Sequence, residues 1–168
     1  MFTVRPDPRL KTTPEEYQRQ FDLLMKISGR VSAANDAVRR IREVREQLDG
    51  AATRAKGLPG DAAKRIAQQV DSIKGRLAAV EEAIYQVKNR SSQDPLNYPI
   101  RLNNKIASLA GVVAGAEAAP TAQAVQVFDE LSTALQVQLD RLKTVLDTDI
   151  PAFNRLVKES DVPAIILR

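Results

Sequence analysis

The chain has 168 residues, which is the usual size of one domain and enough to bury a core without a disulfide or a metal ion. It contains neither cysteine nor histidine. These absences exclude disulfides, thiolate or histidine ligands for a metal, and nucleophilic triads that use a histidine base. We therefore expect no enzyme, no metal site and no cofactor.

The 25 basic and 21 acidic residues give a net charge of +4 and are mixed along the chain. The densest basic stretch is interleaved with acidic residues, which is typical of a solvated helix face with local ion pairs. It comprises Arg39, Arg40, Arg42 and Arg45, with Glu43 and Glu46. No apolar run approaches the roughly 20 residues that cross a bilayer, and the first residues lack the apolar core of a signal peptide. We expect no nucleic-acid partner, no membrane insertion and no signal peptide in this chain.

The first helix is expected to begin at "TTPEEY", where Thr13 is the N-cap, Pro14 the first helical residue and Glu16 completes a capping box. An apolar stripe follows with a spacing of about 3.4 residues, close to the period of helices packed in a left-handed supercoil. The stripe contains Tyr17, Phe21, Leu24, Ile27, Val31, Ala34, Val38, Ile41, Val44 and Leu48. The helix is expected to end at Gly50 or to extend to about Lys56.

The second helix follows the turn cluster "GLPGD", in which Asp61 is a natural N-cap. Its apolar residues alternate steps of four and three and give the clearest helical pattern in the chain. They are Ile66, Val70, Ile73, Leu77, Val80, Ile84 and Val87. We expect this helix to extend to about Asn89.

The third helix carries a short apolar stripe and a group of small residues beside it. The stripe is Leu102, Ile106, Leu109 and Val113, and the small residues are Ala110, Gly111, Ala114 and Gly115. Small residues at this spacing favour close approach of a neighbouring helix.

The fourth helix is expected to begin after Thr121 and to carry a stripe of Phe128, Leu131, Leu135, Leu139, Leu142 and Leu146. Pro151 removes an amide donor, so it must kink or restart the helix. Asp149 would cap the restarted part, which carries Phe153, Leu156 and Val157. We interpret Asp147 and Asp149 as capping or solvated residues rather than a catalytic pair, because nothing in the pattern places either in a cleft.

Four amphipathic helices with short connections predict an all-α fold, namely an antiparallel up-and-down four-helix bundle. Its first and last helices would be long, and the last would be kinked near Pro151. Residues 1–12 are expected to form an extended lead-in, residues 13–160 the bundle, and residues 161–168 an extended tail. We expect a monomer.

The stretch "DPLNYPIRLNNKI", residues 94–106, interrupts the helical period. Its two prolines, Pro95 and Pro99, favour extended backbone at the residues before them. The segment is therefore expected to cross the bundle in extended form, with Leu96 and Tyr98 covering the end of the bundle. Asn97 or Tyr98 would lie where the third helix begins.

Four residues of this stretch are the candidate site: Tyr98, Arg101, Asn103 and Asn104. Polar groups near a helix N-terminus can bind an anion or a carboxylate. They also tie down loops by hydrogen bonds to unpaired backbone groups. We expect the anchoring role and keep binding as the alternative.

The segments "QDPLNYPIRLNNKIASLAGVV", "AAPTAQAVQVFDEL" and "TDIPAFNRLVKESDVPAI" resemble the C-terminal helical region of large bacterial proteins built on sortilin-like or Asp-box β-propellers. Such proteins are often labelled glycosyl hydrolases. The start, "FTVRPDPRLKTTPEEYQRQFDLLMKI", looks like the last strand of a preceding β-sandwich that enters the first helix. The resemblance implies a domain excised from, or related to, an exported protein, with a periplasmic or secreted location. It implies no catalytic residues here, because a glycosidase label would belong to the propeller.

The leading hypothesis is a non-catalytic helical accessory or interaction domain, whose partners are neighbouring domains of a parent chain or another protein. The alternative is a bundle that binds a small ligand or a peptide in the groove near Tyr98 and Arg101. A large apolar pocket with convergent polar groups would favour that alternative. An enzyme that relies on lysine, tyrosine or carboxylates alone is a third hypothesis.

Overall fold

The computed structural model describes residues 7–59 and 61–162, and all regular elements within them are helical. Five α-helices occur in the order α1 (Pro14–Ala55), α2 (Ala62–Ile84), α3 (Leu102–Ala114), α4 (Ala122–Thr144) and α5 (Ile150–Glu159). A short 3₁₀ helix, η1 (Asp94–Leu96), lies between α2 and α3. A π-helical segment, η2 (Val145–Asp149), joins α4 to α5 without a break. The all-α prediction is confirmed for the described residues.

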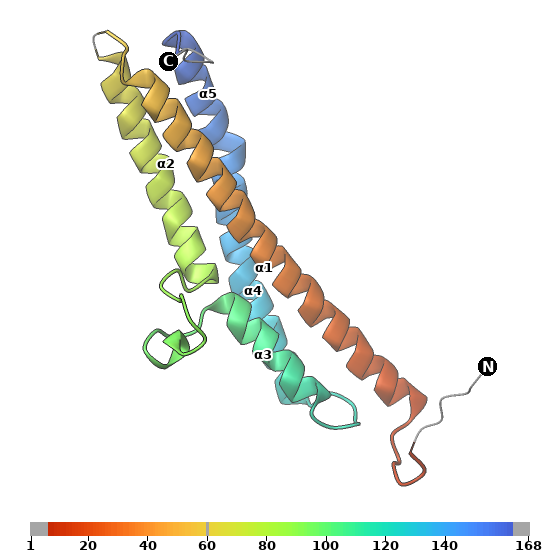
Figure 1. The fold of residues 1–168 in the computed structure, drawn as a ribbon. Coiled ribbons are helices and arrows are strands. Elements are labelled where there is room, and N and C mark those ends of the chain that lie inside the picture. Colours follow the sequence, from red (N-terminus) through yellow and green to blue (C-terminus); the bar gives the residue numbers. More distant parts are fainter. Residues whose placement is uncertain (1–6, 60, 163–168) are drawn as a thin grey trace, which may run out of the picture.

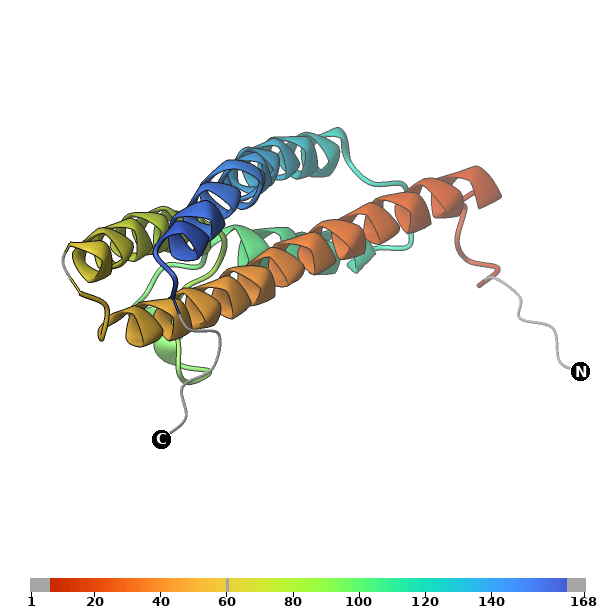
Figure 2. The ribbon, with the colours of Figure 1, turned by 90° about the horizontal axis from the view of Figure 1, so that it is seen from above.

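The helices form three rods, and successive rods run in opposite directions (Figure 1). The first rod is α1, which has 42 residues and contacts both α2 and α3. The second rod consists of α2 and α3, which follow one another in the same direction, opposite to α1. The third rod, α4 with α5, returns in the direction of α1 and contacts α2 and α3. Figure 2 shows the same order from above.

This arrangement differs from the predicted up-and-down four-helix bundle. The prediction placed α3 antiparallel to α2, whereas the structure places it beyond the end of α2, against the N-terminal half of α1 (Figure 1). The reason lies in the link between them, which shifts the chain sideways without reversing its direction. Residues 1–6 and 163–168 lie outside the described residues, so the predicted lead-in (1–12), tail (161–168) and domain boundaries stay predictions.

The start of α1 confirms the predicted capping box. The Thr13 side chain accepts a hydrogen bond from the Glu16 backbone N–H, and the Glu16 carboxylate accepts one from the Thr13 N–H. The helix continues through Gly50 to Ala55, with Lys56 as its C-cap. Most of the predicted stripe is buried. The prediction that Phe21 belongs to it is wrong, because Phe21 is 57% exposed and Leu23 is buried instead. The prediction used one period for the whole of α1. The buried face of α1 shifts along the helix, because its neighbour is α3 near the start and α2 near the end.

The apolar stripe of α2 forms the centre of the core. Its residues from Ile66 to Ile84 are buried against α1 and the third rod. The helix ends at Ile84 rather than near Asn89, so Val87 lies beyond it and is exposed. Asp61 occupies the N-cap position, but its side chain makes no capping hydrogen bond.

The ends of α3 and α4 agree only in part with the sequence. The Thr121 hydroxyl oxygen accepts a hydrogen bond from the Ala124 N–H at 3.1 Å, as expected of the cap. The predicted close approach is wrong at Gly111, which is exposed and where a Cβ would meet nothing within 4 Å. Ala114 and Gly115 are exposed as well, whereas Ala110 is partly buried against the core.

The chain passes Pro151 without leaving the helix, and the π-helical segment η2 lies directly before this proline. Asp149 makes no capping hydrogen bond, which corrects the predicted cap. Its carboxylate instead accepts hydrogen bonds from Arg76 Nη1 at 2.7 and 2.8 Å and links α5 to α2. Asp147 pairs with Lys143 on the surface. The kink stays a prediction. None of the helices in the described part of the chain has the length and apolar character of a bilayer span.

Candidate functional site

The corner that connects α2 to α3, residues 85–101, is not extended as predicted. It contains the 3₁₀ helix η1, in which Pro95 lies in the first turn and leaves no donor unpaired. Leu96 is 83% exposed, so it does not cover the end of the bundle. Helix α3 begins after its N-cap residue Arg101, rather than at Asn97 or Tyr98 as predicted.

A single carboxylate organises the first half of the corner. Asp94 accepts hydrogen bonds from the backbone N–H groups of Arg90 and Ser91, and one from the Ser91 hydroxyl at 3.0 Å. The bonds from the Arg90 and Ser91 amides favour the ionised form and hold the pKa of Asp94 below its ordinary value. The Asp94 carbonyl also accepts hydrogen bonds from the N–H groups of Asn97 and Tyr98. Asp94 thus closes the turn on both sides.

Gln86 connects the two ends of the corner. Only 5% of this residue is exposed, and its Nε2 donates a hydrogen bond to the Pro99 carbonyl at 2.9 Å. Its Oε1 accepts one from the Lys88 N–H at 3.3 Å. A buried amide that satisfies two loop backbone groups is an anchor. Sequence reasoning missed both Gln86 and Asp94. An Asp directly before a proline, with Ser91 three residues earlier, was the available signal for Asp94.

The four predicted residues lie over one turn at the start of α3 and make few contacts with one another. Tyr98 is partly exposed, and Lys88 Nζ lies 5.5 Å from its ring centroid. The Arg101 side chain is exposed and makes no capping hydrogen bond. Asn103 is buried, and its Oδ1 accepts a hydrogen bond from the Asn104 N–H at 2.8 Å. This bond joins two neighbouring residues within α3 and does not tie down the loop, so the roles of all four residues stay predictions.

A buried ion-pair cluster joins α1 to α2 just before the corner. Glu81 is only 3% exposed and lies between two arginines of α1. Its Oε1 accepts a hydrogen bond from Arg42 Nε, and its Oε2 one from Arg45 Nη1, both at 2.7 Å. The Arg42 guanidinium also lies 5.2 Å from the Tyr85 ring centroid. The sequence predicted local pairs along α1; Arg40 with Glu43 is such a pair, whereas Arg42 and Arg45 bind the neighbouring helix.

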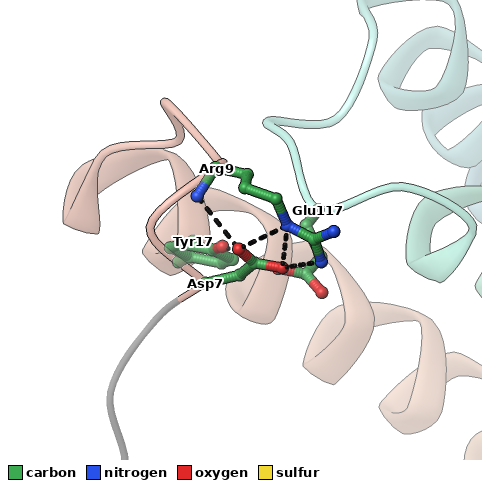
Figure 3. A network of polar contacts seen from close by, with 4 residues as sticks. All are labelled: Asp7, Arg9, Tyr17 and Glu117. Atoms are coloured by element: carbon green, nitrogen blue, oxygen red, sulfur yellow. Dashed lines mark hydrogen bonds and ion pairs between the residues drawn. The ribbon is translucent and has the colours of Figure 1, made fainter.

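A second polar cluster lies where the chain enters α1 (Figure 3). Arg9 pairs with Asp7, with Nη2 2.5 Å from Oδ2, and this bond holds the pKa of Asp7 below its ordinary value. The Tyr17 hydroxyl donates a hydrogen bond to Glu117 Oε2 at 2.9 Å, which raises the pKa of Tyr17. The Thr12 hydroxyl donates to the Glu117 carbonyl. The entering segment is thereby tied to the loop between α3 and α4.

An exposed apolar patch adjoins this cluster. It consists of Tyr17, Phe21 and Met25, which follow one another at four-residue spacing and therefore share one face of α1; we call it the entry patch. Phe21 is 57% exposed and Met25 is 55% exposed. Phe21, Tyr17 and Pro14 also line a shallow hollow with Thr12. Phe21 and Met25 are exposed and Tyr17 is half-buried, so the patch lies open next to the entry of the chain into α1.

Comparison with protein-family models, with characterised proteins and with solved structures finds no match to this chain. The resemblance to propeller proteins therefore stays an expectation. Within residues 7–59 and 61–162, no group of three acidic side chains is placed to hold a metal ion.

Proposed function

We propose that this chain is a non-catalytic helical accessory or interaction domain that packs against a neighbouring domain or another protein. The entry patch is the observation that carries the proposal. Large apolar side chains gain free energy when covered, at roughly 25 cal/mol per Å². Phe21 and Met25 remain largely uncovered although the core holds similar residues.

The polar cluster beside the patch supports the same function. Tyr17 and Thr12 both bond to Glu117, so the entering segment is held in one orientation on the bundle. A fixed entry is what a domain needs if it is to present one face to a neighbour that precedes it. The proposed location, periplasmic or secreted, has only the resemblance to propeller proteins as its support.

Site-specific photocrosslinking in cells that produce the protein tests this proposal. A benzoylphenylalanine at position 21 should give a discrete adduct with a neighbouring domain or protein. The same group at Gln68, which is exposed on α2, is the matched control and should give none. Met25→Asp should abolish the adduct at position 21, because a carboxylate in the contact would have to be desolvated.

Equal adduct patterns from positions 21 and 68, or an adduct that survives Met25→Asp, would contradict the proposed surface. An enzyme assay provides the second test. A hydrolysis rate on glycosides, peptides or phosphate esters that persists after repurification, and disappears with one Asp or Glu substitution, would contradict the non-catalytic function.

A ligand site near Tyr98 and Arg101, the alternative function, gains no specific support from the geometry. Tyr98 contacts Lys88, and the Arg101 side chain is exposed without a capping bond. The corner is held by Gln86 and Asp94 instead.

A further inference from the structure

A groove of about 500 Å³ lies between the C-terminal half of α1 and the start of α5. This volume is within the range of about 300 to 1,000 Å³ that is typical of small-molecule sites. Its apolar lining comes from both helices and from η2: Val44, Leu48, Ala51, Leu146, Ile150 and Phe153. The groove combines this apolar lining with polar side chains, among them Gln47 and Asn154, and is separate from the corner and the entry patch.

Arg54, in the last turn of α1, is one of two arginines that line this groove, and Arg40 is the other. The Arg54 Nε is buried and has no hydrogen-bond acceptor among the residues that the structure describes. A Cβ on Gly50 would lie 3.3 Å from Arg54 Nη1, so the guanidinium folds back over the preceding turn of α1. A buried donor without a partner is rare and requires an explanation.

The charges around Arg54 leave its guanidinium available to an anion. Arg40, at the other end of the groove, is 3.4 Å from Glu43. Glu46 also lines the groove, but in the described part of the chain it forms no ion pair with Arg54. The buried Nε cannot reach a ligand in the groove, but the Arg54 side chain lines the groove, and a carboxylate matches the planar fork of a guanidinium.

We propose that this groove binds a carboxylate amphiphile, with the aliphatic chain along the apolar lining and the carboxylate on Arg54. The lining on the third rod extends from Leu146 to Phe153, about 10 Å at 1.5 Å per helical residue. An alkyl chain of medium length therefore matches the groove. The site is independent of the accessory function and of the entry patch.

Titration of the full chain with decanoate, below the concentration at which it forms micelles, tests the site. Calorimetry should show saturable binding, and Arg54→Gln should weaken it about ten- to a hundredfold, the effect of losing a charge-assisted hydrogen bond. Arg54→Lys keeps the charge but loses the fork, so its affinity should be intermediate. Arg65→Gln, which removes an exposed arginine of α2, is the matched control and should bind like the unmodified chain.

Two further probes separate the head group from the chain. Decyltrimethylammonium carries the same chain with the opposite charge and should bind at least tenfold more weakly, and hexanoate should bind more weakly than decanoate. Amide NMR shifts on decanoate addition should centre on Ala51 and Phe153 and leave Ile106 in α3 unchanged. Equal affinity of the unmodified chain and Arg54→Gln, equal affinity for both head groups, or shifts centred on α3 would overturn the proposal. Thermal unfolding of each variant identifies any that fails to fold.

Discussion

The two halves of α1 face different neighbours and differ in how fully they are covered. The C-terminal half packs on α2, and its apolar residues, such as Ile41 and Leu48, are buried as the stripe predicts. The N-terminal half packs on the shorter α3, and there Phe21 and Met25 remain exposed. One helix with one apolar period therefore has two environments.

This difference between the two halves shows that an apolar stripe predicts which face of a helix can be buried. It does not predict which neighbouring element covers that face. α3 packs on α1 at least as closely as α2 does, so Phe21 and Met25 are exposed because they lie on a face of α1 that α3 does not cover. The polar contacts divide in the same way. Glu81 is buried between α1 and α2, whereas Tyr17 and Glu117 meet at the exposed entry.

The largest expected effect is loss of packing in α2, the helix that covers the C-terminal half of α1. Leu77 is fully buried, so Leu77→Ala should lower the free energy of unfolding by about 2–5 kcal/mol. Phe21→Ala, in the other half, removes a larger side chain but should change stability by no more than about 0.5 kcal/mol, because that side chain is mostly exposed. Urea unfolding of both variants measures the contrast. Similar losses would show that the two halves are covered alike.

The buried ion-pair cluster should give the next largest effect. Glu81→Gln removes the charge that satisfies Arg42 and Arg45 and should lower the free energy of unfolding by about 1–3 kcal/mol. The loss is below that of a fully buried pair, because both guanidiniums are partly exposed and regain water. Glu82→Gln makes the same change on the adjacent exposed residue and should be close to neutral. A Glu82→Gln variant as unstable as Glu81→Gln would contradict a specific role for the cluster.

Local features of the fold could be predicted because they depend on few neighbours. The helix starts at Thr13 and Thr121 follow from caps that bond within one turn. The stripe of α2 follows from its spacing. The direction of α3 could not be predicted, because Pro95 and Pro99 restrict the local backbone angles but do not determine whether the chain reverses. The burial of Glu81 was also hidden, since it depends on two arginines more than 30 residues earlier.

The corner should contribute a smaller amount than the core. Gln86→Ala removes hydrogen bonds to Pro99 and Lys88 and should lower the free energy of unfolding by about 1 kcal/mol. Gln93→Ala, in the exposed part of the same corner, should be close to neutral. Urea unfolding compares the two, and hydrogen exchange of Leu96 to Asn104 should accelerate only in Gln86→Ala. Equal losses of unfolding free energy in Gln86→Ala and Gln93→Ala would contradict the anchoring role of Gln86.

The candidate site was predicted less well than the helices. The sequence indicated correctly that the chain leaves the helical pattern within residues 94–101, because two prolines four residues apart cannot share one helix interior. It assigned the anchoring to Tyr98, Arg101, Asn103 and Asn104. The contacts come instead from Gln86 and Asp94, whose partners are backbone groups of the loop itself. Which backbone groups a side chain can reach depends on the geometry of the turn. That geometry cannot be predicted from the residue types alone.

The smallest expected effect is local and depends on pH. Asp94 has a pKa below its ordinary value in the folded corner, because the Arg90 and Ser91 amides bond to its carboxylate. The unfolded segment has the ordinary value, so it binds a proton more readily. The contribution of Asp94 to corner stability is therefore complete above the ordinary pKa and is lost as pH falls through the lower, folded value.

Hydrogen exchange of the Asn97 and Tyr98 amides measures this loss, because both donate to the Asp94 carbonyl at 2.9 Å. After correction for the intrinsic rate, their protection should be constant near pH 5 and should decline as the pH falls below about 4. Asp94→Asn should start with lower protection and lose this decline, because an amide carries no titrating charge. Asp71→Asn, on the exposed face of α2, should behave like the unmodified chain. A decline of the same size in Asp94→Asn would assign the pH dependence to another group and leave the corner without its proposed carboxylate anchor.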